Sequence, residues 1–75
     1  MRDGELIMEE KIVSIYSIGP RDVFHFANSL RPFILRGDRF ININEDEVIL
    51  WEDLENTDLM FYNNENVAVF GELSY

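Results

Sequence analysis

The stretch FILRGDRFINI, residues 33–43, decides the fold that we expect for this chain. A Gly-Asp pair lies between two runs that are rich in β-branched and aromatic residues, and such a pair is typical of a two-residue β-hairpin turn. A turn of this length places Leu35 opposite Phe40 and Ile34 opposite Ile41. The stretch therefore predicts two antiparallel strands.

A third strand is predicted by the apolar run VILW, residues 48–51, which follows the polar loop of residues 44–47. If that loop closes a hairpin, three pairs lie opposite each other: Ile43 with Val48, Ile41 with Leu50, and Arg39 with Glu52. The same register stacks five apolar side chains on one face: Ile34, Ile41, Ile43, Val48 and Leu50. We therefore expect a three-stranded meander.

The residues before the meander predict a strand and then a helix. Residues 11–18 are rich in β-branched residues and favour a strand with Val13 and Ile15 on one face. Pro20 suits the first position of a helix, where its missing N–H is no loss, and Pro32 ends that helix. Four apolar residues follow the i, i+3, i+4, i+7 spacing of a buried helical stripe: Val23, Phe26, Ala27 and Leu30.

The remaining residues predict a second hairpin. Residues 52–58 form an acid-rich connection with room for one helical turn. The apolar runs 59–62 and 67–70 flank an Asn-Asn-Glu-Asn segment, and asparagine tolerates the left-handed backbone of tight turns. The whole pattern predicts an α+β domain of order β-α-β-β-β-β over residues 11–75. One helix packs on a twisted, mainly antiparallel sheet, and residues 1–10 form a flexible tail.

Length and composition limit the class of protein. The chain has 75 residues, enough for one small domain. Its hydrophobic fraction of 47% argues against disorder and leaves apolar surface that a homodimer would cover. The chain has no cysteine, which excludes a disulfide or a thiolate metal site. No apolar run approaches the roughly 18 residues of a membrane span, so we expect a cytoplasmic location, in the host cytoplasm if a phage encodes the protein.

The charge is distributed very unevenly along the chain. Every lysine and arginine lies at or before Arg39, and the six bases there balance six acids. The remaining nine acids follow without any base, so the formal charge of −9 comes from the second half. A surface of this kind repels nucleic acid and acidic membranes, and it attracts basic clefts.

The spacing of these acids suggests a partner. On a strand, residues i and i+2 lie about 6.6 Å apart on one face, close to the separation of successive phosphates along a nucleic-acid strand. Glu45 and Glu47 have this spacing, and so do Asp53 and Glu55. We predict that seven carboxylates act as phosphate surrogates: Glu45, Asp46, Glu47, Glu52, Asp53, Glu55 and Asp58. Trp51 or Tyr62 would serve as the apolar anchor of the contact.

Two functions fit these observations. The first is a non-enzymatic inhibitor that mimics nucleic acid and occupies the DNA-binding groove or channel of a basic protein. A nuclease, a CRISPR effector, a polymerase or a sliding clamp is a possible target, by analogy with small acidic phage proteins. The alternative is a small dimeric interaction module that uses apolar sheet surface, with residues 59–70 forming a sheet-edge contact and the acids serving solubility only.

Other motifs carry little weight. His25 is the sole histidine and has no cysteine to act with, and a chain this short has little room for a water-excluding active site. Arg36-Gly37-Asp38 spells an adhesion tripeptide, which the hairpin turn explains. The residues after Asn42 begin like a calcium loop but lack its glycine and its bidentate glutamate. We therefore expect no catalytic residue, metal or cofactor.

Overall fold

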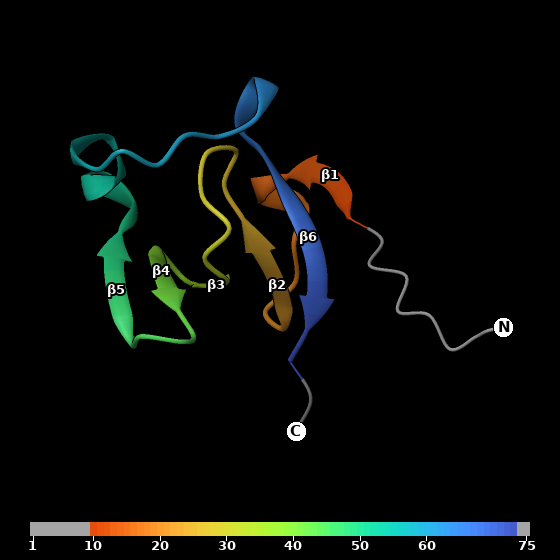
Figure 1. The fold of residues 1–75 in the computed structure, drawn as a ribbon, viewed down its shortest axis with the longest axis horizontal. Coiled ribbons are helices and arrows are strands. Elements are labelled where there is room, and N and C mark those ends of the chain that lie inside the picture. Colours follow the sequence, from red (N-terminus) through yellow and green to blue (C-terminus); the bar gives the residue numbers. More distant parts are fainter. Residues whose placement is uncertain (1–9, 74–75) are drawn as a thin grey trace, which may run out of the picture.

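The computed structural model describes residues 10–73 and contains one six-stranded antiparallel sheet (Figure 1). In chain order the strands are β1 (Lys11–Ser14), β2 (Asp22–His25), β3 (Phe33–Arg36), β4 (Arg39–Asn42), β5 (Glu47–Leu50) and β6 (Asn66–Glu72). Their spatial order is β1-β6-β2-β3-β4-β5. Three short 3-10 helices connect them: η1 (Ile15–Ser17), η2 (Trp51–Asn56) and η3 (Asn63–Glu65). Of the predicted N-terminal tail, only Glu10 lies within the described residues. Within residues 10–73, no helix is long and apolar enough to cross a membrane.

The predicted helix after Pro20 is wrong, because this segment forms the interior strand β2. Val23, Phe24 and His25 are consecutive and all buried, as expected of a strand that is covered on both faces. Leu30, which the helical stripe would bury, is 80% exposed. A helix of about ten residues is marginal without strong packing, whereas β6 supplies β2 with a backbone partner. The α+β class is therefore corrected to a β-sheet connected by 3-10 turns.

The predicted Gly-Asp hairpin is confirmed between β3 and β4. Leu35 lies opposite Phe40 and Ile34 opposite Ile41, in the register that the two-residue turn sets. Gly37 has φ of +62°, a left-handed conformation that glycine adopts without steric cost. The information for this hairpin is local, so the sequence was sufficient to predict it.

The predicted register between β4 and β5 is wrong by two residues. Ile41 lies opposite Val48, and Arg39 lies opposite Leu50 in place of Glu52. The turn takes in residue 43, which we had placed in the strand. A shift of two residues keeps each strand residue on its predicted face, so only the cross-strand partners change.

The core covers one face of the sheet and is built from aromatic rings. Phe24, Phe26, Phe33 and Phe40 are each 0% exposed. Phe26 lies edge-on to Phe24, Phe33 and Phe40, with ring centroids 5.3–5.7 Å apart. Edge-to-face contacts of this kind contribute stability beyond the area that they bury. These four rings come from β2, β3, β4 and the residue after β2, so they tie the middle of the sheet together.

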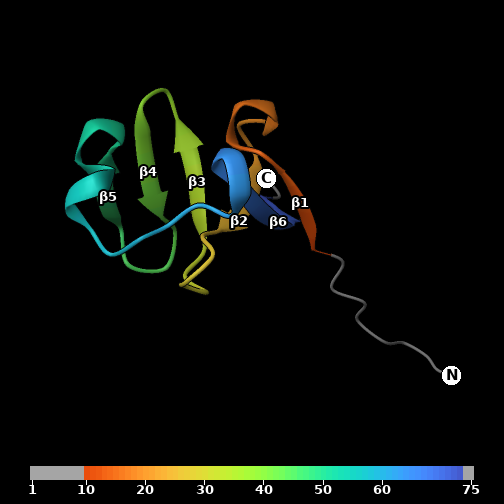
Figure 2. The same cartoon turned by 90° about the horizontal axis from the view of Figure 1, so that it is seen from above.

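The connection between β5 and β6 closes the open side of this core. The helix η2 lies beside β5, and the segment after it runs past β4 and β3 toward η3 (Figure 2). Leu54 of η2 and Leu59 are buried in the core cluster, and Phe61 packs against it. Ala27 N–H donates to the Met60 carbonyl at 2.8 Å, which fixes this segment to the connection after β2.

The predicted second hairpin is reduced to one contact. Tyr62 forms an isolated bridge with Asn66, while residues 59–61 adopt no strand. Strand β6 pairs instead with β1 on one side and β2 on the other. It is therefore an interior strand of the sheet, and the sheet-edge contact that we assigned to residues 59–70 does not fit this topology.

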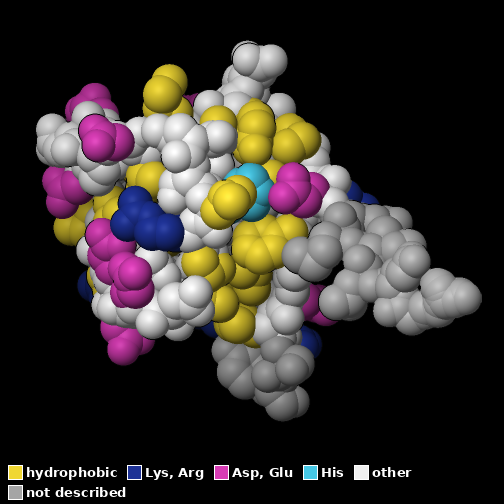
Figure 3. All heavy atoms as spheres, in the orientation of Figure 1, with side chains coloured by type: hydrophobic (Ala, Val, Ile, Leu, Met, Phe, Trp, Pro, Cys, Tyr) yellow, Lys and Arg dark blue, Asp and Glu magenta, His cyan; other side chains and the backbone are white. Residues whose placement is uncertain are grey.

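The other face of the sheet holds the buried His25. Its Nδ1 lies 2.8 Å from the Phe26 carbonyl and its Nε2 lies 3.0 Å from a Glu10 carboxylate oxygen. Both of these oxygens accept hydrogen bonds, so each ring nitrogen faces an acceptor. Phe70 and other apolar side chains surround the histidine (Figure 3). The histidine is thus engaged in structural contacts.

Candidate functional site

Strand β5 is one free edge of the sheet, and the predicted carboxylates gather around it. Glu45 and Asp46 lie in the turn before β5, Glu47 begins the strand, and the others follow it. Figure 3 shows acidic side chains along the margin where β5 and η2 lie. We call this set the acidic edge: Glu45, Asp46, Glu47, Glu52, Asp53, Glu55 and Asp58.

Hydrogen bonds and backbone shape fix the turn before β5. The side-chain oxygen of Asn42, which is 1% exposed, accepts the N–H groups of Asn44 and Glu45 at 2.9 and 3.3 Å. Asp46 adopts a left-handed backbone with φ of +56°. Glu45 is therefore a turn residue, and the strand spacing that we predicted between Glu45 and Glu47 is wrong.

One cation from the first half of the chain reaches this turn. Arg31 Nη1 donates to Glu47 Oε1 at 3.1 Å, and both side chains are about two-fifths exposed. A solvent-exposed pair of this kind contributes little stability, typically below about 1 kcal/mol. It does neutralise Glu47, so the neighbouring carboxylates of Glu45 and Asp46 are the better candidates for contact with a partner.

The second acidic group lies on η2. The backbone N–H of Trp51 donates to the Asp38 carbonyl at 2.7 Å where η2 begins. Leu54 anchors the middle of η2 in the core. In a 3-10 helix the side chains at i and i+3 eclipse each other. Glu52 and Glu55 therefore share a face, and the strand spacing that we predicted for Asp53 and Glu55 is wrong.

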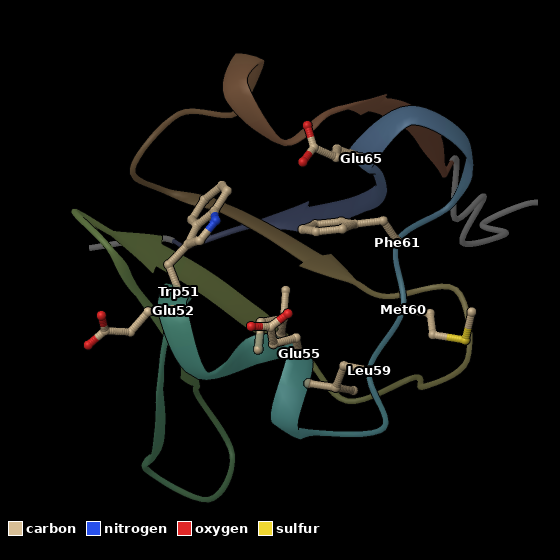
Figure 4. A pocket seen from close by; sticks show the side chains of 8 residues that line it. Trp51, Glu52, Glu55, Leu59, Met60, Phe61 and Glu65 are labelled. Carbon is tan, nitrogen blue, oxygen red and sulfur yellow. The ribbon is translucent and has the colours of Figure 1, made fainter.

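A cavity of about 520 Å³ opens beside this face of η2 (Figure 4). Its apolar wall includes Trp51 and Phe61, whose ring centroids lie 6.4 Å apart at an interplanar angle of 43°. Three acidic residues also line the cavity, Glu52, Glu55 and Glu65, and the Glu52 side chain extends away from the two rings (Figure 4). Trp51 is held in place because it stacks on the buried Phe40 at 5.1 Å. Here acidic and aromatic groups converge, and we call this cavity the acidic-aromatic pocket.

A second hollow of about 510 Å³ lies beyond the tryptophan. It is lined by residues of η1, among them Ile15 and Tyr16, by Leu35 and the turn of the first hairpin, and by Trp51. The rings of Tyr16 and Trp51 lie 5.8 Å apart. Trp51, which we predicted as an anchor, thus stands between two hollows at the acidic edge.

Glu65 and Tyr16 interact across the chain. The Tyr16 hydroxyl donates a hydrogen bond to the Glu65 carboxylate, which raises the pKa of the Tyr16 phenol; partial loss of water and the negative charge of Glu65 act in the same direction. Our reading of the sequence missed both residues. Neither has a local signal, because the loop that holds Glu65 meets η1 only in the folded chain.

Tyr62 does not join this site. Its ring lies 6.3 Å from His25, beside the other face of the sheet. Asp58 follows η2 in a bend, and its carbonyl accepts a hydrogen bond from the Asn28 side chain. Of the two predicted anchors, only Trp51 lies among the carboxylates.

The described residues give no sign of a metal centre. No group of three or more histidine, cysteine or acidic side chains within residues 10–73 is arranged to hold an ion. The side chains of the acidic edge are exposed to solvent, apart from the half-buried Glu47. Comparison with known protein families, characterised proteins and solved structures finds no match to this chain. The acidic edge and its pocket are therefore the features from which a function can be inferred.

Proposed function

We propose that this chain is a binding protein, not an enzyme, and that its acidic edge occupies the nucleic-acid groove of a basic partner. The observation that carries the proposal is the placement of seven carboxylates around one edge strand, β5. The sequence after Arg39 supplies no cation, although Arg31 from the first half pairs with Glu47. A DNA-binding nuclease, CRISPR effector, polymerase or sliding clamp offers a cleft of the opposite charge.

The spacing of the acids supports mimicry across a groove. Strand β5 has four residues, so its two ends lie roughly 10 Å apart. The major groove of DNA is about 12 Å wide between its phosphate backbones. The segments that carry the carboxylates before and after β5 are thus set apart by a length of the same order as the width of a groove. This arrangement replaces the row of successive phosphates that the sequence led us to expect.

The acids are also held in place, which favours specific binding. The Asn42 side chain fixes the turn that bears Glu45, and Leu54 anchors the η2 helix that bears Glu52 and Glu55. A partner that binds preordered groups loses less conformational freedom on association than one that must order a flexible acidic tail.

A homodimer and a cytoplasmic location belong to the same proposal. Val48 on β5 and Ile12 on β1 are about half exposed, and both lie on the face of the sheet opposite the aromatic core. A second copy packed on this face would cover them and double the negative charge. A basic DNA-binding target would be met in the cytoplasm of the producing cell, or of the host if a phage carries the gene.

The test is capture of DNA-binding proteins on the immobilised chain at low salt, followed by competition with duplex DNA. We expect DNA to displace the captured proteins, since both ligands would use the same groove. The double variant D53K/E55K should lose most of this capture. The matched variant D38K/E72K makes the same charge change at exposed acids outside the acidic edge and should retain it.

Salt gives a second criterion. Capture by complementary charge weakens steeply as ionic strength rises, because ions screen the two surfaces from each other. Capture that resists both duplex DNA and salt would refute the mimicry proposal. Circular dichroism on each variant distinguishes a lost contact from a lost fold.

A further inference from the structure

The acidic-aromatic pocket joins two features that seldom occur together on a protein surface. Its wall is apolar and aromatic, through Trp51, Phe61 and the buried Leu54 and Leu59. Three carboxylates from two separate segments line it: Glu52 and Glu55 come from η2, and Glu65 from η3. None of the eight residues around it is a lysine or arginine. The lining of the pocket therefore carries negative charge with no cation among its residues to balance it.

The size and stiffness of the pocket suit a ligand group. Its volume of about 520 Å³ falls within the range of ordinary ligand sites. The wall is built from core residues, since Leu54 and Leu59 belong to the buried cluster and Trp51 stacks on Phe40. The segment of Phe61 is fixed from the other side, where Met60 N–H donates to the Asn28 side chain at 3.0 Å.

We propose that this pocket receives the guanidinium group of an arginine from the partner. The inference rests on the proposed function, and it names the group that the acidic edge recognises. A guanidinium is planar and weakly hydrated, so it stacks on aromatic rings such as Trp51 and Phe61 while its N–H fork meets a carboxylate bidentately. Glu55 on η2 can accept that fork, whereas the Glu52 side chain extends away from the two rings (Figure 4) and adds negative charge nearby.

Other occupants fit less well. A lysine ammonium is compact and strongly hydrated, and it lacks the planar fork. An apolar side chain would fill the wall but leave the acidic residues around the pocket without a counter-charge. A metal ion would need a convergent ligand group, which residues 10–73 do not form. The aromatic wall and the carboxylates together favour arginine.

The chain carries its own probe for this site, because Trp51 is its only tryptophan. We would titrate the full chain with capped hexa-arginine and hexa-lysine peptides and record tryptophan fluorescence. Hexa-arginine should change the emission in a saturable way and bind about tenfold more tightly than hexa-lysine, the size expected from one stacked and desolvated cation.

Two variants assign this preference to the pocket. Glu52→Gln with Glu55→Gln should remove the preference for arginine, and so should Phe61→Leu, which keeps an apolar wall without the ring. The matched control Glu45→Gln with Asp46→Asn removes two charges at the other end of β5. It should weaken both peptides equally and leave the preference unchanged.

The outcomes separate this inference from the proposed function. Equal affinity for the two peptides, or no change in Trp51 emission, would overturn the arginine pocket even if DNA still competes for captured proteins. A clear arginine preference together with capture that DNA does not displace would support the pocket and refute nucleic-acid mimicry. A preference that survives in the Glu52 and Glu55 double variant would also overturn the assignment.

Discussion

Among residues 10–73, three residues other than glycine adopt left-handed backbone conformations: Asp46, Asn64 and Glu65. Asparagine tolerates this region, and we predicted the turn around Asn64 for that reason. The sequence offers no comparable reason for the left-handed backbone of Glu65, because this conformation costs an ordinary residue about 1–2 kcal/mol. Its position follows from the folded chain, where it reaches Tyr16. Single-residue roles of this kind lie beyond local sequence patterns.

The hydrogen bond between Tyr16 and Glu65 predicts a measurable titration. Because the phenol donates to the carboxylate, its pKa lies above the usual 10.0. Glu65→Ala keeps the same backbone strain but removes the acceptor and its charge, so the pKa of Tyr16 should fall toward that value. Absorbance at alkaline pH follows phenolate formation, and the variant Tyr16→Phe identifies which transition belongs to Tyr16.

The same bond sets the sign of a pH effect on stability. A phenol whose pKa is raised by folding contributes its stabilisation fully below 10.0, and this is lost as the pH rises through the folded-state pKa. Glu65→Ala should make that alkaline loss shallower. Glu55→Ala, which removes a different carboxylate of the pocket, should leave the Tyr16 titration unchanged, and an equal shift in both variants would contradict the assignment to Glu65.

Among the elements, the hairpin was predicted correctly and the helix was not. The hairpin depends on a Gly-Asp turn and two adjacent strands, all within residues 33–43. Strand β2 depends on pairing with β6, whose residues lie at the far end of the chain. The run Val23 to Phe26 fits a helical stripe and a buried strand equally well by pattern alone. Only the distant partner decides between them.

The hairpin turn gives a clean test at Gly37. A methyl group at this position would meet nothing within 4 Å, but φ is +62°, so the cost of Gly37→Ala comes from the backbone alone. We expect a loss of about 1 kcal/mol in the free energy of unfolding, measured by urea denaturation. Gly19→Ala is the matched control, because its added methyl makes an ordinary contact of 3.6 Å without a left-handed backbone. Equal effects at the two glycines would contradict this account of the turn.

For the whole molecule, the sequence predicted the excess of acids but not their layout. The turn before β5 and the η2 helix after it lie at opposite ends of one strand, so the carboxylates form two groups. The pocket between η2 and η3 was missed, since Trp51, Phe61 and Glu65 come together only when the connections fold over the core. The sequence thus shows which seven residues are acidic, whereas the order of the strands and the course of the connections decide where these residues lie.

The net charge of −9 and the exposed apolar face predict that added salt strengthens dimerisation but weakens the capture of basic proteins. Two copies repel each other at low ionic strength, and the Debye length falls from about 30 Å at 0.01 M to about 10 Å at 0.1 M salt. Burial of apolar surface between copies is not screened. Sedimentation velocity should therefore show a dimer fraction that rises with salt, while capture of basic proteins falls. Val48→Ser, at a half-exposed position of β5, should reduce the dimer, whereas Leu30→Ser, at a more exposed apolar residue outside the sheet, should not. A chain that stays monomeric at every salt concentration would refute the dimer and leave the acidic edge to act as a single copy.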